Sequence, residues 1–369
     1  MIPLFTVNMP PREKLMPELE KVLYSGYIGQ GPKVEEFEKK FATWIGHSNV
    51  LSLNSGTSAL HLALRLAGVE GGEVISSPMT CTATNMPILA NGARIVWADI
   101  DPNTGNIDPL DVERKITKDT KAIMVVHWGG NPADMDAFAY IKAKYGIPII
   151  EDAAHAMGAY WRANKIGNAT ADFTCFSLQA IKHITSVDGG ILMVNDTDTY
   201  KRGKLLRWYG IDREGERKDF RCEEDILDWG YKFHMNDVNA TIAIAQMDQV
   251  DEIVKMHRIT SGSYSVRIYN EFILNPFDLS NSSGAWWLYT LRLKQPEKRA
   301  SFMQFMKECG IQVSKVHERN DKHTTFRQFQ RNLPGVDEFS ERMICIPVHT
   351  NLTSADREQI IAKVNAFCA

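Results

Sequence analysis

The stretch MDAFAYIKAKYGIPIIED, residues 135–152, decides the fold class. Its first part has the apolar spacing of a helix, and its second part, IPIIED, is a short apolar run typical of a buried strand. Similar runs recur along the chain, separated by helical segments or glycine turns: EVISSP, ARIVWADI, KAIMVVHW, DFTCFS and GILMVND. Strands that alternate with helices predict an α/β fold, with a mostly parallel central sheet flanked by helices over roughly residues 45–210.

The length of 369 residues predicts one large and one smaller domain. Residues 237–257, DVNATIAIAQMDQVDEIVKMH, have helical spacing, and we expect one long helix, capped by Asp237, that leaves the large domain. We therefore place a large domain at 1–245, with an N-terminal arm at 1–30, and a small C-terminal α/β domain at 246–369. The small domain would take its strands from WWLYTLRL and ICIPVH.

The composition excludes several classes of protein. The 42 Lys and Arg against 45 Asp and Glu include no basic tract that could bind nucleic acid. The six scattered cysteines form no CxxC pair, so neither a zinc site nor a disulfide framework is indicated, and we expect a reducing, cytoplasmic location and no metal. No stretch approaches 18 uninterrupted apolar residues, so we expect no membrane span.

A first polar motif is NSGTSALH, residues 54–61, which follows a strand and opens a helix. Backbone N–H groups at such a helix start would point at an anion, most naturally a phosphate, and Gly56 and Thr57 would line that site. The alternative is an ordinary helix cap by Ser55 or Thr57.

A second motif ends the strand IPIIED with Asp152, followed three residues later by His155. A carboxylate at a buried strand end needs a partner, and beside a pyridine cofactor it can hold the ring nitrogen protonated. The alternative is that Asp152 caps the next helix.

A third motif is SLQAIKHITSVDGG, residues 177–190. Ser177 ends a strand and offers a second phosphate ligand, while Lys182 could form a Schiff base if burial lowered the pKa of its amine. Gly189 and Gly190 permit a sharp turn into the next strand. In this order the three motifs describe a site for pyridoxal 5′-phosphate (PLP).

The chain resembles the DegT/StrS-type sugar-nucleotide aminotransferases, which have the fold-type I architecture of the aspartate aminotransferase superfamily. The matching segments span nearly the whole chain: SGYIGQGPKVEEFE, NSGTSALHLAL, GARIVWADID, TKAIMVVHWGGNPADMD, EDAAHAMGA, FSLQAIKHITSVDGG, GYKFHMNDVNATIAIAQM and ICIPVH.

The resemblance implies a role for each motif residue. Lys182 would be the Schiff-base lysine, Asp152 the partner of the pyridine nitrogen and His155 a neighbour of the ring hydroxyl. Ser177, Gly56 and Thr57 would hold the phosphate. GYKFH stands where the family has a GYNYR-like segment that reaches the phosphate of the neighbouring subunit, so Lys232 would act across a homodimer with active sites at its interface.

The resemblance also implies the reaction, which is transfer of the amino group of L-glutamate to a keto-deoxy sugar on a nucleoside diphosphate, with release of 2-oxoglutarate. The amino sugar would serve surface polysaccharides such as lipopolysaccharide O-antigen. GYKFH is closer to the branch of the 4-amino-arabinose lipid A pathway, which favours a 4-keto over a 3-keto sugar. The family's rare dehydratases have histidine in place of Lys182.

Two features depart from the pattern or stay open. Cys81 stands in PMTCTAT where many relatives have an aromatic residue that stacks on the cofactor ring, so stacking would come from elsewhere. In VHERNDKHTTF we expect His317, Arg319 and His323 to contact the substrate, although a solvated charged loop is an equal alternative. A non-catalytic PLP or sugar-nucleotide sensor on the same fold is the alternative function.

Overall fold

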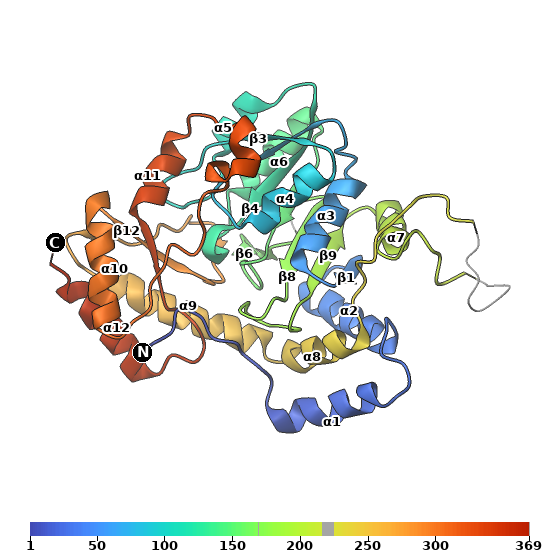
Figure 1. The fold of residues 1–369 in the computed structure, drawn as a ribbon, viewed down its shortest axis with the longest axis horizontal. Helices are drawn as coiled ribbons and strands as arrows, with labels where there is room; N and C mark the ends of the chain where they lie inside the picture. The colour runs from blue at the N-terminus through green and yellow to red at the C-terminus, as the bar shows by residue number, and fades with distance from the viewer. Residues whose placement is uncertain (169, 216–224, 369) are drawn as a thin grey trace.

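The computed structural model describes residues 1–168, 170–215 and 225–368 (Figure 1). At its centre is a seven-stranded sheet with the order β1-β9-β8-β5-β4-β2-β3. Its strands are β1 (Val50–Leu53), β2 (Glu73–Ser76), β3 (Arg94–Trp97), β4 (Thr120–Val126), β5 (Ile149–Asp152), β8 (Phe173–Ser177) and β9 (Gly190–Val194). Each of the six runs expected as strands is one of these, so the predicted α/β fold is confirmed.

The sheet is parallel except at one strand. Adjacent pairs among β3, β2, β4, β5 and β8 are parallel, whereas β9 is antiparallel to both of its neighbours, β8 and β1. The carboxyl ends of β5 and β8 therefore lie side by side at one edge of the sheet, which is where α/β proteins place their ligands.

Apolar side chains alternate between the two faces of the sheet. Along β4, Ile123 and Val125 belong to one core, whereas Ala122 and Met124 belong to the other. Such alternation is what a strand covered on both faces requires. The first core includes the helices α2 (Pro32–Ile45), α6 (Met135–Tyr145) and α8 (Asp237–Met247), and the second includes α3 (Gly56–Leu66) together with segments from the C-terminal part of the chain.

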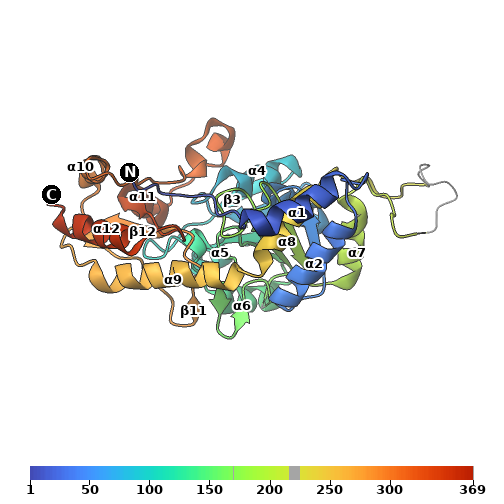
Figure 2. The same ribbon diagram turned by 90° about the horizontal axis from the view of Figure 1, so that it is seen from below.

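The helices around this sheet cover both faces (Figure 2). The helices of this part of the chain are α1 (Arg12–Leu23), α2 (Pro32–Ile45), α3 (Gly56–Leu66), α4 (Thr82–Ala90), α5 (Pro109–Lys115), the 3-10 helix η1 (Trp128–Gly130), α6 (Met135–Tyr145), α7 (Thr197–Leu206), α8 (Asp237–Met247) and α9 (Val250–Arg267).

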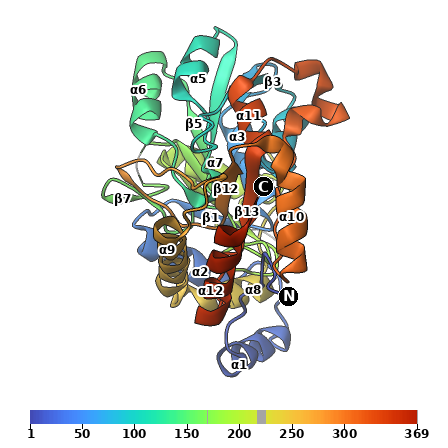
Figure 3. The same cartoon turned by 90° about the vertical axis from the view of Figure 1, so that its left-hand side faces the viewer.

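The C-terminal part forms a second, three-stranded sheet, whose strand β12 lies at the left of Figure 1 and near the centre of Figure 3. Its strands are β10 (Ile273–Leu274), β12 (Tyr289–Leu293) and β13 (Met343–Ile346). The helices of this part are η2 (Pro296–Lys298), α10 (Arg299–Glu308), η3 (Asn320–Lys322), η4 (Thr324–Phe329), α11 (Pro334–Arg342) and α12 (Ser354–Ala366). A small ribbon of β11 (Ser282–Ser283), β6 (Tyr160–Trp161) and β7 (Asn164–Lys165) links the two parts, and the domain boundary at residue 245 stays a prediction.

Two expectations about residues 237–257 were wrong. The segment is not one helix, because α8 ends at Met247 and α9 begins at Val250. Asn236, not Asp237, caps α8, since its side chain accepts a hydrogen bond from the N–H of Asn239. Asp237 is buried and caps α2 instead, accepting from the N–H groups of Gly31 (2.8 Å) and Val34 (3.1 Å). Local periodicity cannot reveal a cap that comes from another helix.

In the part of the chain that the structure describes, no helix is long and apolar enough to cross a membrane.

Candidate active site

A pocket of about 380 Å³ lies where the carboxyl ends of β5 and β8 meet the first turn of α3. This is the edge of the sheet that parallel topology favours for ligands. Most of the side chains expected from the sequence share this pocket: Gly56, Thr57, Asp152, His155, Ser177, Lys182 and His317.

Lys182 lies in the loop between β8 and β9, where its backbone N–H donates to the carbonyl of Gln179 (2.9 Å). Burial lowers the pKa of its amine to about 8, although the nearby Asp152 and Cys81 act in the opposite direction. A lysine with so low a pKa has an appreciable uncharged fraction near neutral pH, and the uncharged amine is the form that attacks a carbonyl carbon. The chemistry proposed for the third motif is therefore available to this side chain.

Asp152 is buried at the end of β5, and both of its carboxylate oxygens have hydrogen-bond donors. The Thr84 hydroxyl donates to one oxygen (2.7 Å), and the N–H of Ala154 donates to the other (3.1 Å). The Thr80 hydroxyl is 2.8 Å from that of Thr84, so the PMTCTAT segment supports the carboxylate from the side of α4. Residues 153–158, which follow Asp152, form turns and no helix, so the alternative that Asp152 caps the next helix was wrong. Its carboxylate lines the pocket instead.

The first turn of α3 meets Ser177 on one side of the pocket. Ser55 caps α3, with its hydroxyl accepting from the N–H of Ser58 (3.0 Å), so the cap interpretation is confirmed. This cap leaves the N–H groups of the first helical residues, Gly56 and Thr57, outside the bonding within the helix. A Cβ atom at Gly56 would lie 2.9 Å from the Cβ of Ser177, so only glycine permits this close approach. The helix start and the Ser177 hydroxyl can together bind a phosphate group.

Two histidines, His155 and His317, also line the pocket. Burial holds the pKa of His155 well below its ordinary value and lowers the pKa of His317 to about 4, and the charge of Lys182 adds to both effects. The two imidazoles are parallel, with ring centroids 5.9 Å apart. They are uncharged at neutral pH and can contact a ligand by hydrogen bonding or stacking.

The loop that carries His317 is fastened to PMTCTAT by Asn320. This buried residue donates from its side chain to the Thr80 carbonyl (2.7 Å) and from its N–H to the Pro78 carbonyl (2.8 Å), and it accepts from Asn85 (2.9 Å). His317 therefore has a fixed place in the pocket although it comes from the C-terminal part.

The structure places the other predicted residues outside this pocket. Arg319 is buried and makes a two-pronged ion pair with Asp321 (2.7 Å for each hydrogen bond) and a further one with Asp337, so it supports the loop instead of facing a substrate. His323 is half-buried at the start of η4. Lys232 is exposed, and its carbonyl accepts from the Asn54 side chain (3.2 Å).

Sequence reasoning missed several residues of the pocket. Trp287, Asp188 and Thr84 line it, but the sequence predicted no role for them, although Asp188 belongs to the third motif and Thr84 to PMTCTAT. Cys81 lines the pocket as well, and the aromatic rings nearby come from His155 and Trp287. The hydrogen bond from Thr84 to Asp152 in β5 joins residues that are 68 positions apart, so a local sequence pattern could not predict it.

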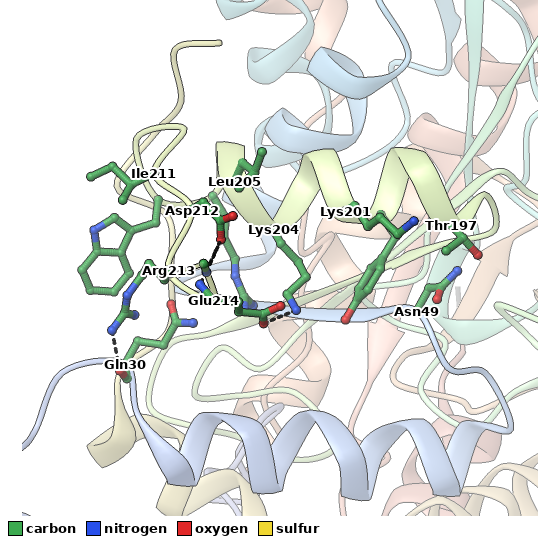
Figure 4. Close-up of a pocket in the computed structure, with 14 residues that line it drawn as sticks. Gln30, Asn49, Thr197, Lys201, Lys204, Leu205, Ile211, Asp212, Arg213 and Glu214 are labelled. Carbon is green, nitrogen blue, oxygen red and sulfur yellow. Dashed lines mark hydrogen bonds and ion pairs between the residues drawn. The ribbon is translucent and has the colours of Figure 1, made fainter. Parts of the chain in front are cut away.

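A second hollow, of about 600 Å³, lies between α7 and residues 211–215 (Figure 4). Its cations have partners: Lys204 pairs with Glu214, Arg213 donates to the Gln30 carbonyl (3.3 Å), and Lys201 pairs with Asp198 (3.0 Å). None of the residues predicted for chemistry lines it. The smaller pocket at Lys182 is therefore the candidate active site.

Comparison with known proteins agrees with this geometry. The model of the DegT/DnrJ/EryC1/StrS aminotransferase family matches residues 11–365. The chain belongs to this family. The solved structure of the sugar aminotransferase CalS13 from Micromonospora echinospora has a TM-score of 0.94 to this chain at 35% identity, and the match covers 99% of this chain and 100% of that one.

Two further proteins similar to this chain concern polysaccharide biosynthesis and the PLP cofactor. The spore coat polysaccharide biosynthesis protein SpsC from Bacillus subtilis (strain 168) is 30% identical over 94% of this chain and 92% of its own length. The PLP-form of Spr1654 from Streptococcus pneumoniae has a TM-score of 0.88 at 26% identity, covering 98% of this chain and 97% of its own. The chain is thus a member of a sugar aminotransferase family, and that family depends on PLP.

The residues of the pocket fit that cofactor. A phosphate fits the close approach of Gly56 to Ser177 at the start of α3, a pyridine nitrogen fits the fixed carboxylate of Asp152, and an aldehyde fits the amine of Lys182 with its low pKa. All three groups line one pocket.

Proposed function

We propose that the protein is a PLP-dependent aminotransferase that moves the amino group of L-glutamate to a keto-deoxy sugar linked to a nucleoside diphosphate, with a 4-keto sugar favoured. The observation that carries this proposal is one pocket lined by Lys182, Asp152 and Ser177. We place the enzyme in the cytoplasm, where it would make amino sugars for surface polysaccharides. The similarity to a spore coat polysaccharide biosynthesis protein supports that product class.

The residues of the pocket would divide the chemistry among them. When bound, PLP supplies an aldehyde that accepts amines and a pyridine ring that takes up electron density. Asp152 would keep the ring nitrogen protonated, since Thr84 and Ala154 hold its carboxylate toward the pocket. Lys182 would hold the cofactor between reactions and, once free, carry a proton to or from the substrate carbon as an amine.

The pocket lacks the positive charge that its ligands would need. Among the described residues that line it, Lys182 is the sole lysine or arginine, whereas the cofactor, glutamate and a nucleoside diphosphate are all anionic. We therefore propose a homodimer in which the partner subunit completes the site, with Lys232 reaching the phosphate of the neighbouring pocket. Lys232 is exposed and lies outside the pocket of its own chain, which is consistent with this role.

Large exposed apolar side chains are consistent with the same dimer. Tyr24, Leu227 and Trp229 are 84%, 91% and 60% exposed. Exposed apolar side chains of this size are ones that an interface between two subunits could cover.

The alternative is a protein that binds PLP or a sugar nucleotide without turnover. The match to an aminotransferase family favours the enzyme, whereas the low pKa of the Lys182 amine suits attachment of PLP in either case. If L-glutamate added to the purified holoprotein released no 2-oxoglutarate and left the absorption of the cofactor unchanged, the sensor would be supported instead.

A panel of ketosugars tests the reaction. We expect amino transfer from L-glutamate to at least one nucleotide-linked 4-keto-deoxy sugar, measured as amino sugar and 2-oxoglutarate by mass spectrometry. Matched 3-keto isomers and free sugars without the nucleotide are the controls. Turnover of the 3-keto sugars alone would overturn the keto position, and no turnover of any member would overturn the proposed substrate class.

Replacing Lys232 by alanine should weaken the binding of PLP about tenfold, because a hydrogen bond from a cation to a phosphate contributes about 1.5 kcal/mol or more. Titration of the cofactor into the stripped protein measures this effect, and Lys255→Ala, which removes an exposed lysine paired with Glu252, is the control. An unchanged affinity would show that Lys232 does not bind the phosphate.

A mixed dimer tells whether Lys232 acts in its own subunit or across the interface. Co-expression of Lys232→Ala with Lys182→Ala puts both lysines together in one site only if Lys232 reaches the partner. We then expect activity at low PLP that neither variant shows alone. If no activity returns although mixed dimers form, Lys232 acts within its own chain.

A further inference from the structure

Trp287 forms a wall between the candidate active site and a much smaller cavity. It is 3% exposed and lines both the pocket of about 380 Å³ and a cavity of about 20 Å³ that is also lined by Phe5, His183, His257 and His349. Lys182 lines both spaces too. The lysine and the indole thus lie together at the partition between the two.

The backbone around Trp287 forms hydrogen bonds with the short helix η1, at the end of strand β4 of the large sheet. The N–H of Ala285 donates to the Gly130 carbonyl (2.9 Å), and the N–H of Leu288 donates to the Gly129 carbonyl (3.0 Å). Both acceptors belong to η1, which follows β4. The backbone on both sides of Trp287 is therefore held in place next to the end of β4.

The indole contacts the lysine loop, a ring of the pocket and the N-terminal segment. Its Nε1–H donates to the carbonyl of Ile181 (2.8 Å), the residue before Lys182. The ring stacks on His155 with centroids 3.9 Å apart, and on Phe5 of the N-terminal segment at 5.0 Å. The Nζ atom of Lys182 lies 3.7 Å from the indole centroid, well within the range of a cation–π interaction.

The other groups around the amine do not replace this contact. Asp152 and Cys81 act on the amine from the pocket side, and no hydrogen bond or ion pair joins either of them to Nζ among the described residues. The pKa values of the neighbouring imidazoles of His155, His183 and His317 are all lowered by burial, so these rings are neutral and do not repel the amine at neutral pH. The indole is therefore the group in direct contact with Nζ.

We propose that Trp287 is a positioning residue that receives the amine of Lys182 whenever this amine is not bound to the cofactor, and holds it at the wall of the pocket as an ammonium group on the indole face. This role rests on the proposed function of Lys182. The hydrogen bond to Ile181 and the stack on Phe5 keep the indole in place for it. A plain structural role would need the bulk of the ring and not its π face.

Two substitutions separate the π face from the bulk. Trp287→Phe and Trp287→Leu both lose the hydrogen bond to Ile181 and some volume, but phenylalanine keeps an aromatic face. The full-length protein is stripped of cofactor and labelled with trace acetic anhydride over pH values from below 8 to above 10.5. Mass spectrometry of the peptide containing residue 182 then reports the fraction of free amine, with exposed Lys255 as the internal reference.

The cation–π contact stabilises the ammonium, so its loss should release a proton more readily. In Trp287→Leu we expect the midpoint of labelling to fall by about one pH unit, which is about ten times more free amine at a fixed pH below the midpoint. In Trp287→Phe we expect a change of less than about twofold. Equal shifts in the two variants, a rise in both, or no shift in either would overturn the proposal.

The design keeps this inference separate from the proposed reaction. Labelling is done without cofactor or amino donor, so a failure here leaves the reaction untouched, and a failed transamination assay leaves the labelling result interpretable. If Trp287→Leu does not fold, Trp287→Met replaces it, because methionine adapts to irregular cavities and also lacks a π face.

Discussion

Lys182→Ala is expected to abolish amino transfer and to leave the protein colourless after incubation with PLP. Proton transfer by a positioned amine contributes about 10²–10⁴-fold to a rate, and this variant also loses the covalent anchor. Single-turnover assays with L-glutamate measure the loss, and the visible absorption of the holoprotein measures the attachment.

The Lys182→Ala variant should fold normally, so a loss of activity can be attributed to the missing amine. The folded pKa of Lys182 is about 8, lower than the ordinary 10.5, so burial of its charged form costs free energy in the folded state. That cost is fully present below pH 8 and diminishes as the pH rises toward 10.5. Alanine removes the cost, and thermal unfolding near neutral pH should show no loss of stability. Residual turnover within tenfold of the wild type would mean that another amine carries the reaction.

Asp152→Asn should lower the rate of amino transfer by about a hundredfold or more. Removing the charge from a buried ion pair costs about 3 kcal/mol or more, and each 1.36 kcal/mol corresponds to about tenfold in rate. Asparagine keeps one oxygen that can accept from Thr84, so the local fold should survive. Steady-state kinetics measure the loss of rate, and titration of the cofactor measures any loss of affinity for PLP.

Asp134→Asn is the matched control for the loss of one carboxylate. Asp134 caps α6 by accepting from the N–H of Ala137, and asparagine is an equally good cap, so neither activity nor stability should change. If Asp152→Asn behaved like this control, Asp152 would not face the ring nitrogen, and the orientation proposed for the cofactor would be wrong.

The central sheet was predictable because its signals are local. Short apolar runs such as that of β5, with a helix such as α6 before them, predict a strand and a crossover wherever they occur. The break between α8 and α9 was not predictable, since apolar spacing continues across Asp248 and Gln249. The two helices differ in their packing. The buried apolar residues of α8 belong to one core of the large sheet, whereas α9 begins in that core and continues into the core of the C-terminal sheet.

For the site, the motifs indicated the residues that end strands or begin helices, such as Asp152, Ser177 and Gly56. They could not indicate Thr84 or Trp287, which reach the pocket through contacts between distant segments. Charge alone was misleading for Arg319, because the carboxylates of Asp321 and Asp337 that bind it inside the protein cannot be recognised from the loop sequence. His317 in the same loop does face the pocket, because Asn320 fastens the loop there.

The attachment site of the cofactor tests the central claim most directly. The holoprotein is reduced with borohydride, digested, and mapped by tandem mass spectrometry for the phosphopyridoxyl group. We predict this group on Lys182, and on no other lysine in stoichiometric amount. A modified lysine elsewhere in the chain, or a protein that takes up PLP without any reducible bond, would contradict the account.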